Sequence, residues 1–470
     1  MGSLLSSQQE ITGTGKRSFD EVQKSDTEDA DSVVEIPKRK KLRGTSGYIY
    51  QTLFVGGEGS DVTISALGKE WKLHKIYLKQ SKYFQSMFSG QWKESQDDFI
   101  SIQVPDDLIT VEAMNTTLGS LYSDDITVTM TTVIPLLAAS GLLQLDNLAT
   151  HCSQFMRESI NSRTVCQYFT AAKRYSESEV ETKCIEWLER GLTSSWTVNL
   201  LKELSVELMQ QVIESPGLFV MQIEIDIYTL LIIWIFLKLN PTWTGSNTDL
   251  KTQSSEFFRS RDQGRAQAFL DTPEGELFVP AFKGLRLHHV INDIRSMVTL
   301  QSDNVIPSDW LNSVYMEQWK RVMFIYQNLD HGPSEDTTLA QFNSSAHRYG
   351  RILEKSTRYC WRWTGFLYGL DIIVMFNNRT RQLSFRRNTY LHPSHGMVCI
   401  QQKHKFMVKV DIAAFNNNGC EKFHKTSGIK YLSLGLDEEV RILQVDKHVS
   451  YPIYVSAHIA MVTVPVEKDR

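Results

Sequence analysis

The sequence predicts a multidomain α+β protein whose last part is mostly β. Three patterns along the 470 residues lead to this prediction. Strand-like and helix-like runs alternate over residues 47–158, apolar residues follow a helical period over 159–327, and short β-prone runs fill 345–470. A chain of this length exceeds one ordinary core, so we expect two to four domains.

The composition is that of a globular protein without a strong overall charge. Hydrophobic residues make up 41% of the chain and the formal net charge is -4, so no global field attracts nucleic acid or an anionic membrane. The first ten residues lack the basic flank and apolar core of a signal peptide. The apolar run at 227–237 is too short to span a bilayer and is expected to form a buried helix.

The cysteines and short motifs favour a non-catalytic chain. The six cysteines are scattered without a CxxC pair, which is typical of reduced thiols in a cytosolic or nuclear protein. His392 and His395 with Cys399 form only a faint metal-ligand pattern, because a second close pair is absent. Nothing in the sequence activates Cys152 or Cys360 recognisably. With no phosphate loop, nucleophile elbow or HExxH motif, we expect no catalytic residue, no cofactor and no metal.

Residues 1–46 are expected to form a disordered tail, because they are rich in polar and charged groups and poor in large apolar ones. Gly2, with Ser6 after it, fits the N-myristoylation pattern, and one such chain would give only weak, reversible membrane contact. A compact basic cluster further along the tail is typical of a nuclear import signal, with a solvated charge cluster as the alternative. Its members are Lys38, Arg39, Lys40, Lys41 and Arg43.

The mixed region begins near Tyr48. Residues 61–64 and 71–73 alternate like two strands around a turn at Leu67-Gly68, and 100–104 alternate like a third strand. The intervening and following segments show helical patterns; they are 76–78, 83–88, 108–121, 133–143 and 145–156. Mixed strands and helices of this length make one α+β domain.

The next region is expected to be helical, with a polar insertion near 243–265. In 180–188 four apolar residues share one helical face and are interpreted as core; they are Val180, Cys184, Trp187 and Leu188. The helical period returns at 278–291 and 309–323, and a polar linker follows at about 328–348.

The C-terminal region is predicted to be a β-sandwich or barrel. Short β-prone runs are spaced along it, at 372–376, 382–386, 397–400, 406–412, 431–434, 453–455 and 461–464. Trp361 and Trp363 alternate in a further strand, and Asn377-Asn378 suits a hairpin turn. Four nearby arginines favour a solvated sheet edge over a nucleic-acid groove; they are Arg379, Arg381, Arg386 and Arg387.

Several separated motifs resemble the BTB/POZ family in the right order. They are residues 60–64 (SDVTI), 73–78 (LHKIYL), 81–88 (SKYFQSMF), 104–107 (VPDD) and 121–126 (LYSDDI). The resemblance covers about 48–158. Residues 161–175, 184–188 (CIEWL) and, more weakly, 285–290 (LRLHHV) resemble the helical BACK region of BTB adaptors.

As a whole, the chain resembles the germ cell-less-like family. The telling stretches are 48–54 (YIYQTLF), 306–311 (IPSDWL) and 359–366 (YCWRWTGF). Membership implies an adaptor of the cullin-3 ubiquitin ligase, a place in the nuclear matrix or at the inner nuclear envelope, and a role in germ-cell development. It also implies partners such as the lamina-associated protein LAP2-beta and a DP transcription-factor subunit.

The resemblance places cullin-3 docking on Trp92 and Glu94, within Trp92-Lys93-Glu94, with Tyr122 and the helix at 133–143 completing the surface. An outward aromatic residue can fill a cleft and Glu94 can fix the loop. From the sequence alone, a loop tryptophan is more often folded into its own core. BTB domains usually form symmetric homodimers through their N-terminal segment, so Tyr48, Tyr50, Leu53 and Phe54 are candidate interface residues.

Asp61 and Lys75 match paired polar positions of the BTB fold and are interpreted as a partly buried ion pair. Two functional hypotheses follow. In the first, the chain delivers a nuclear client to cullin-3 through a C-terminal client-binding domain and catalyses nothing itself. In the second, it is a nuclear-envelope scaffold or transcriptional corepressor that uses the BTB domain only to dimerise.

Overall fold

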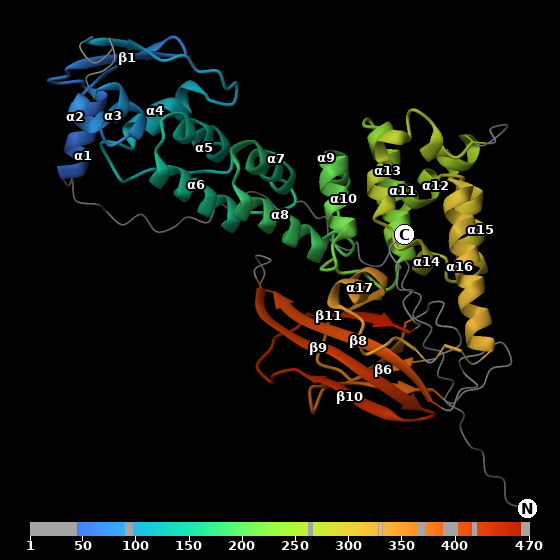
Figure 1. Cartoon of the computed structure of the whole chain (residues 1–470). Coiled ribbons are helices and arrows are strands. Elements are labelled where there is room, and N and C mark those ends of the chain that lie inside the picture. Colours follow the sequence, from blue (N-terminus) through green and yellow to red (C-terminus); the bar gives the residue numbers. More distant parts are fainter. Residues whose placement is uncertain are drawn as a thin grey trace, which may run out of the picture. The chain divides into compact units, whose positions relative to one another are not determined.

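The computed structural model describes residues 45–89, 97–261, 267–327, 329–330, 332–363, 372–388, 403–415 and 421–461 (Figure 1). These residues form two compact units, and the boundary between them along the chain lies between Trp187 and Leu188. We call the part up to Trp187 the N-terminal unit and the part from Leu188 the C-terminal unit. Helix α8 (Ser178–Gly191) runs through the boundary. The multidomain α+β architecture predicted from the sequence is confirmed.

The N-terminal unit combines a three-stranded sheet with a set of helices. Strand β1 (Val62–Ala66) pairs antiparallel with β2 (Lys69–Leu73) and parallel with β3 (Phe99–Ser101). The β1–β2 turn has Leu67 and Gly68 at positive φ, 50° and 75°, where glycine is favoured at the second position. The helices are α1 (Thr45–Ile49), η2 (Tyr50–Val55), α2 (Lys75–Leu78), α3 (Lys82–Met87), α4 (Val111–Gly119), α5 (Val133–Leu142), α6 (Asp146–Glu158) and α7 (Val165–Tyr175).

Local capping explains where several of these helices begin. The Ser81 hydroxyl accepts from the Phe84 N–H at the start of α3, and Thr110 does the same for Ala113 at the start of α4. Helix α7 is tied to the same unit through Asp106, which accepts from Arg174 and from the Tyr175 hydroxyl, both at 2.8 Å. Helix α7 therefore belongs to the same compact unit as the strands and helices before it.

The first half of the C-terminal unit is helical. Its helices are α9 (Val198–Glu203), α10 (Val206–Glu214), α11 (Ile225–Leu239), α12 (Asn247–Arg261), η4 (Phe269–Asp271), η5 (Glu276–Phe278), α13 (Val279–Lys283), α14 (Leu287–Val290), α15 (Ile294–Asp303) and α16 (Ser308–Tyr326). The apolar run expected to be a buried helix is α11, with residues from Ile227 to Leu237 at its centre.

Helix α12 occupies the stretch that the sequence analysis interpreted as a polar insertion. Only Leu250, Ser254 and Phe258 of its residues are buried, at spacings of four. Such a narrow stripe is enough to pack a surface helix against α11, but it is hidden by the polar residues around it. A short helix, α17 (Leu339–Ser345), likewise lies inside the predicted linker, where a Thr338–Gln341 capping box starts it.

The second half of the C-terminal unit is a β-sandwich. One sheet has the order β10-β7-β6-β5 and the other β4-β11-β8-β9, and all their pairings are antiparallel. The strands are β4 (His347–Leu353), β5 (Tyr359–Arg362), β6 (Ile372–Asn377), β7 (Gln382–Arg387), β8 (Lys403–Phe415), β9 (Glu421–Gly435), β10 (Glu439–Gln444) and β11 (Ile453–Ala460). Strands β4 and β10 were missed by the sequence analysis, and the run at 397–400 lies outside the described residues.

Both sheets contribute alternate residues to one core, including Val374 and Phe385 from one sheet and Val408 and Val455 from the other. The helical half meets the sandwich at Gly350 of β4. A Cβ there would lie 2.3 Å from the Val220 carbonyl oxygen, so only glycine allows this approach. The Gln222 N–H then donates to the Gly350 carbonyl at 3.1 Å.

Candidate protein-interaction sites

The predicted docking residues Trp92 and Glu94 lie outside the described residues. The segment that carries them connects α3 to β3, and the described residues at its two ends converge on Lys75. The Lys75 ammonium lies 3.5 Å from the Asp98 carboxylate and 5.8 Å from the centre of the Phe88 ring. The Thr63 N–H also donates to the Asp98 carbonyl at 2.7 Å. Both ends of this connection are therefore fixed to the sheet and to α2.

The predicted ion pair between the side chains of Asp61 and Lys75 is wrong, because Asp61 binds the backbone of Lys75 and not its ammonium group. Asp61 Oδ1 accepts from the backbone N–H of Lys75 at 2.7 Å, at the start of α2. A carboxylate at the first turn of a helix satisfies a backbone donor that has no partner within the helix. The Lys75 side chain is thereby left to interact with Asp98 and Phe88.

The sequence analysis placed Tyr122 on the docking surface. The structure instead shows Tyr122 as a buried core residue. Its side chain is 5% exposed and stacks on Tyr77 with ring centroids 4.3 Å apart. Its hydroxyl oxygen accepts from the His74 N–H at 2.9 Å. Burial raises the pKa of Tyr122 to about 12. Tyr122 therefore helps to position α2 through its contacts with His74 and Tyr77.

The predicted dimer segment is divided between exposed and buried residues. Tyr48 is 68% exposed, Tyr50 and Leu53 are half-buried, and Phe54 is only 6% exposed. Phe54 packs between the rings of Tyr50 and Tyr122, at 5.1 and 5.3 Å, so its role is to anchor the segment to the core. An exposed apolar residue next to it, Val55, was missed.

The remaining predicted features fall outside the described residues or differ from expectation. Gly2, the basic cluster at residues 38–43 and the His392, His395 and Cys399 group lie outside them. Burial raises the pKa of the Cys152 thiol to about 12, which disfavours a nucleophilic thiolate. Arg386 and Arg387 do not lie on a sheet edge, because their strand β7 pairs with β10 on one side and β6 on the other, and Arg387 is buried. Arg379 and Arg381 lie in the turn before β7.

A buried polar cluster joins the helical half of the C-terminal unit to the sandwich. Arg348 of β4 forms two hydrogen bonds with the Glu224 carboxylate, at 2.8 and 3.0 Å, and both side chains are fully buried. Burial favours the neutral acid, but the Arg348 guanidinium outweighs it and holds the pKa of Glu224 below its usual value. Arg348 also donates to the carbonyls of Ile213 and Ser215.

Histidines surround this ion pair. His289 donates to the Ser345 carbonyl at 2.7 Å and stacks on His347, whose Nδ1 lies 3.0 Å from the Tyr349 hydroxyl. Burial lowers the pKa of His347 and of His458 to about 3, so both are neutral near pH 7. The sequence analysis missed this cluster; its one signal was the density of Arg and His in residues 285–290 and 347–348.

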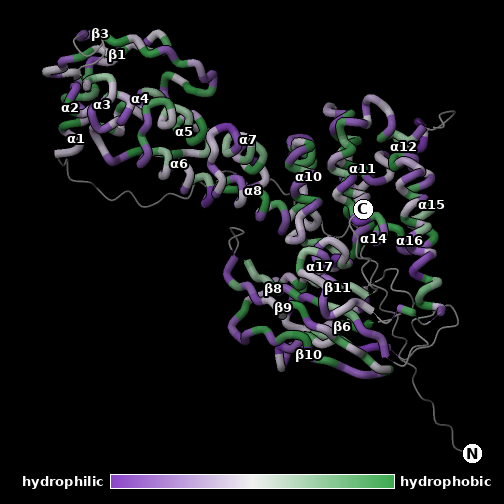
Figure 2. The backbone as a smooth tube through the Cα atoms, viewed as in Figure 1, coloured by the Kyte–Doolittle hydropathy of each residue, from purple (hydrophilic) through white to green (hydrophobic). Residues whose placement is uncertain are grey.

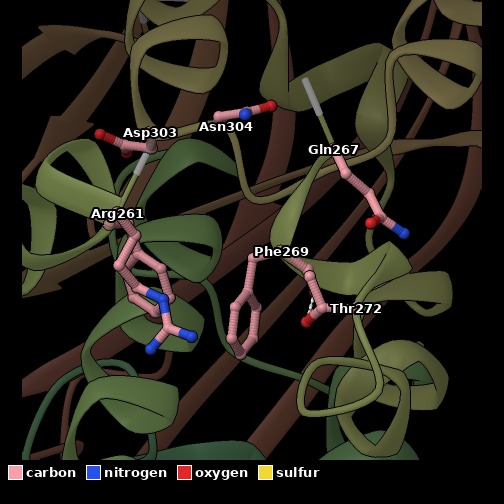
Figure 3. A pocket seen from close by; sticks show the side chains of 7 residues that line it. Arg261, Gln267, Phe269, Thr272, Asp303 and Asn304 are labelled. Atoms are coloured by element: carbon pink, nitrogen blue, oxygen red, sulfur yellow. Dashed lines mark hydrogen bonds between the residues drawn. The ribbon is translucent and has the colours of Figure 1, made fainter. Parts of the chain in front are cut away.

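A small pocket near the end of α12 carries no sign of a ligand site (Figure 3). Phe258, Arg261, Phe269 and Asp303 are among its lining residues. Its charged groups are already paired, since Arg261 binds Glu274 and Asp303 accepts from Arg259 at 2.9 Å. Among the described residues, no cluster of His, Cys, Asp and Glu could hold a metal ion.

Comparisons with known proteins agree with the fold. The BTB/POZ domain family matches residues 50–160. Human germ cell-less protein-like 1 is 42% identical over 93% of this chain and 84% of its own length. The Drosophila melanogaster protein germ cell-less is 35% identical over 91% of this chain and 79% of its own length. The chain belongs to the germ cell-less family. This confirms the resemblance found in the sequence.

Membership of the germ cell-less family makes the chain a BTB adaptor-like protein. Proteins with this domain and of this family are generally non-catalytic and act through protein–protein contacts. Within the described part of the chain, no helix combines the length and the apolar character needed to cross a membrane.

Proposed function

We propose that this germ cell-less family member is a substrate adaptor of the cullin-3 ubiquitin ligase that recruits a nuclear or nuclear-envelope client. The BTB/POZ match over residues 50–160 is the observation that carries the proposal. In this proposal the N-terminal unit binds the cullin and the C-terminal unit binds the client. Ubiquitin transfer then benefits from proximity, and the chain performs no bond chemistry itself.

The cullin contact is proposed to centre on Trp92 and Glu94. Phe88, before their segment, and Asp98, after it, both contact Lys75, which supports an interaction site beside α2. Phe99, directly after the segment, is 54% exposed and can extend an apolar contact. Lys75 is a positioning residue in this arrangement, and Tyr122 supports α2 through its stacking on Tyr77.

The adaptor is proposed to work as a homodimer through Tyr48 and Val55, which are 68% and 61% exposed. The basic cluster at residues 38–43 would direct the chain to the nucleus. Clients there would include LAP2-beta or a DP transcription-factor subunit, in a germ-cell setting. The import signal, the clients and the germ-cell setting are proposed from the family resemblance.

The decisive experiment compares cullin-3 binding by the wild-type chain and the Trp92→Ala, Glu94→Ala variant, using purified full-length proteins in surface plasmon resonance. We expect affinity to fall at least tenfold, because truncating one buried aromatic anchor commonly costs 2 kcal/mol or more, about thirtyfold. Lys75→Met should weaken binding less, since it removes the contacts to Phe88 and Asp98 without removing the anchor.

Trp319→Ala in α16 is the matched control, since it removes an exposed tryptophan from the other unit. Its cullin affinity should equal that of the wild type. Unchanged binding in the Trp92, Glu94 variant would refute the ligase role and favour a dimeric scaffold.

A further inference from the structure

Helix α16 (Ser308–Tyr326) exposes an apolar stripe. Of its nineteen residues, only Leu311 and Ile325 are buried. Met316, Trp319, Met323 and Tyr326 are 57%, 61%, 37% and 65% exposed. Their spacing of three, four and three places them on one face of the helix. We call these four residues the α16 stripe.

The opposite side of α16 is firmly attached. Ile325 belongs to the core of the sandwich. The Gln318 side-chain amide donates to the carbonyls of His288 and Ile291, at 3.0 and 2.8 Å. Arg321 pairs with Glu317 one turn away. The helix therefore presents its stripe on a fixed support, which lowers the entropy lost when a partner binds.

The size and composition of the stripe suit a protein contact. An aromatic side chain offers roughly 150–250 Å² of surface, so Trp319 and Tyr326 together expose on the order of 200–300 Å². With the two methionines, the stripe reaches the several hundred Å² that mark interaction sites. Tryptophan and tyrosine are common energetic centres of interfaces, and methionine adapts to differently shaped partners.

Lys320 limits what can cover the stripe. It is exposed and lies on the same face, four residues after Met316 and three before Met323. A partner that covers the stripe must supply a carboxylate, because a buried unpaired ammonium is costly. A second copy of α16 packed about a two-fold axis near Trp319 would instead bring two Lys320 ammonium groups together.

We propose that the α16 stripe is a docking surface for an amphipathic helix of another protein, one whose apolar face carries a carboxylate opposite Lys320. An amphipathic helix matches a straight stripe because both repeat at i, i+3, i+4 and i+7. That this helix belongs to the client rests on the proposed function. The docking surface itself does not depend on cullin binding.

The test is a display selection with a library of randomised 18-residue helical peptides on the immobilised full-length chain, with counter-selection on the Trp319→Ala, Met323→Ala variant. Enriched peptides should share aliphatic residues at helical spacing and one Asp or Glu. They should bind the wild type in solution at least tenfold more tightly than the double variant.

A charge exchange sharpens the test. Lys320→Glu should reverse the preference, so that matched peptides with Lys in place of the acidic residue bind better. Equal binding to the wild type and the double variant, or an unchanged preference in Lys320→Glu, would overturn the proposal.

Two further measurements address other occupants. Sedimentation velocity should give the same oligomeric state for the wild type and Trp319→Ala. If the variant forms a smaller oligomer, the stripe is a contact between copies of this chain and the proposal is overturned. If peptides bind only after residues 1–44 are removed, the tail is the occupant and the proposal fails. Cullin-3 affinity should be unchanged in all stripe variants, which separates failure here from failure of the adaptor role.

Discussion

Helices α11 and α16 belong to the same unit and are both rich in large apolar residues, yet they are used in opposite ways. Ten of the fifteen residues of α11 are buried, against two of the nineteen of α16. Figure 2 shows the tube of α11 as mainly hydrophobic, whereas hydrophobic and hydrophilic residues alternate along α16. The tryptophan of α11, Trp234, is fully buried, whereas Trp319 of α16 is 61% exposed.

The comparison teaches that α11 stabilises the core, whereas α16 leaves most of its apolar residues exposed. Around α11 the polar groups are paired: the Trp234 N–H donates to the Leu204 carbonyl at 3.2 Å, and the Tyr228 hydroxyl donates to Asp303 at 3.2 Å. Unpaired polar groups would be costly there. On α16, Lys320 and the apolar stripe are exposed, which leaves them accessible to the partner proposed above.

The largest expected effect is that of Trp234→Ala. It removes a fully buried ring that packs edge-on against Phe278 at 5.3 Å, and it leaves the Leu204 carbonyl without its donor. The free energy of unfolding of the C-terminal unit should fall by about 5 kcal/mol. Hydrogen exchange of α11 backbone amides measures this loss. A loss no larger than that of Trp319→Ala would contradict the contrast between the helices.

The next effect concerns the ion pair at the start of α11. Arg348→Met leaves the Glu224 carboxylate buried and unpaired, which should cost about 3 kcal/mol or more in urea unfolding. Adding Glu224→Leu should recover much of this stability. With both residues replaced by apolar ones, no unpaired charge is left buried. If the double variant is less stable than Arg348→Met, this explanation is wrong, because removing the unpaired charge would then not have restored stability.

Acid should destabilise the C-terminal unit. The pKa values of His347 and His458 are about 3 in the folded chain, well below about 6.5 in the unfolded one. Between these values the unfolded chain binds more protons, so stability present above pH 6.5 is lost as the pH falls. Between pH 7 and 5.5 these two histidines should remove roughly 2.5 kcal/mol, and the opposing effect of Asp226 leaves a net loss of roughly 1 kcal/mol, measured by urea midpoints.

Asp226 provides the control for this pH dependence. Burial raises its pKa to about 7, above about 3.9 in the unfolded chain, so its contribution to stability grows as the pH falls through 7. Asp226→Asn removes this opposing effect, and the acid dependence should become steeper. If the urea midpoint of Asp226→Asn does not change with pH, the buried histidines do not control the acid dependence of stability.

The smallest effect is that of Trp319→Ala on stability. Because the side chain is 61% exposed, the free energy of unfolding should change by less than about 0.5 kcal/mol. The same hydrogen-exchange measurement used for Trp234→Ala gives the comparison directly. A loss of several kcal/mol would mean that the ring packs against the protein's own surface in solution, and the α16 stripe would lose its central residue.

Sequence periodicity predicted local structure well where apolar residues repeat strongly. The strands around Leu67 and Gly68, the buried helix α11 and the C-terminal strands follow from such repeats. It failed at α12, where only three residues at spacings of four are buried. A sparse stripe gives a weak periodic signal because most of the helix faces water.

The sequence by itself determined the class of the fold, the order of its regions and membership of the germ cell-less family, because these depend on local patterns and on motifs read in order. Only the tertiary structure decided that Tyr122 and Phe54 point inward, that Asp61 caps α2, and that Arg348 meets Glu224 across 124 residues of chain. It also decided that α16 leaves its apolar face uncovered. The physical reason is that a side chain's burial depends on which distant segment packs over it, and no local repeat specifies that segment.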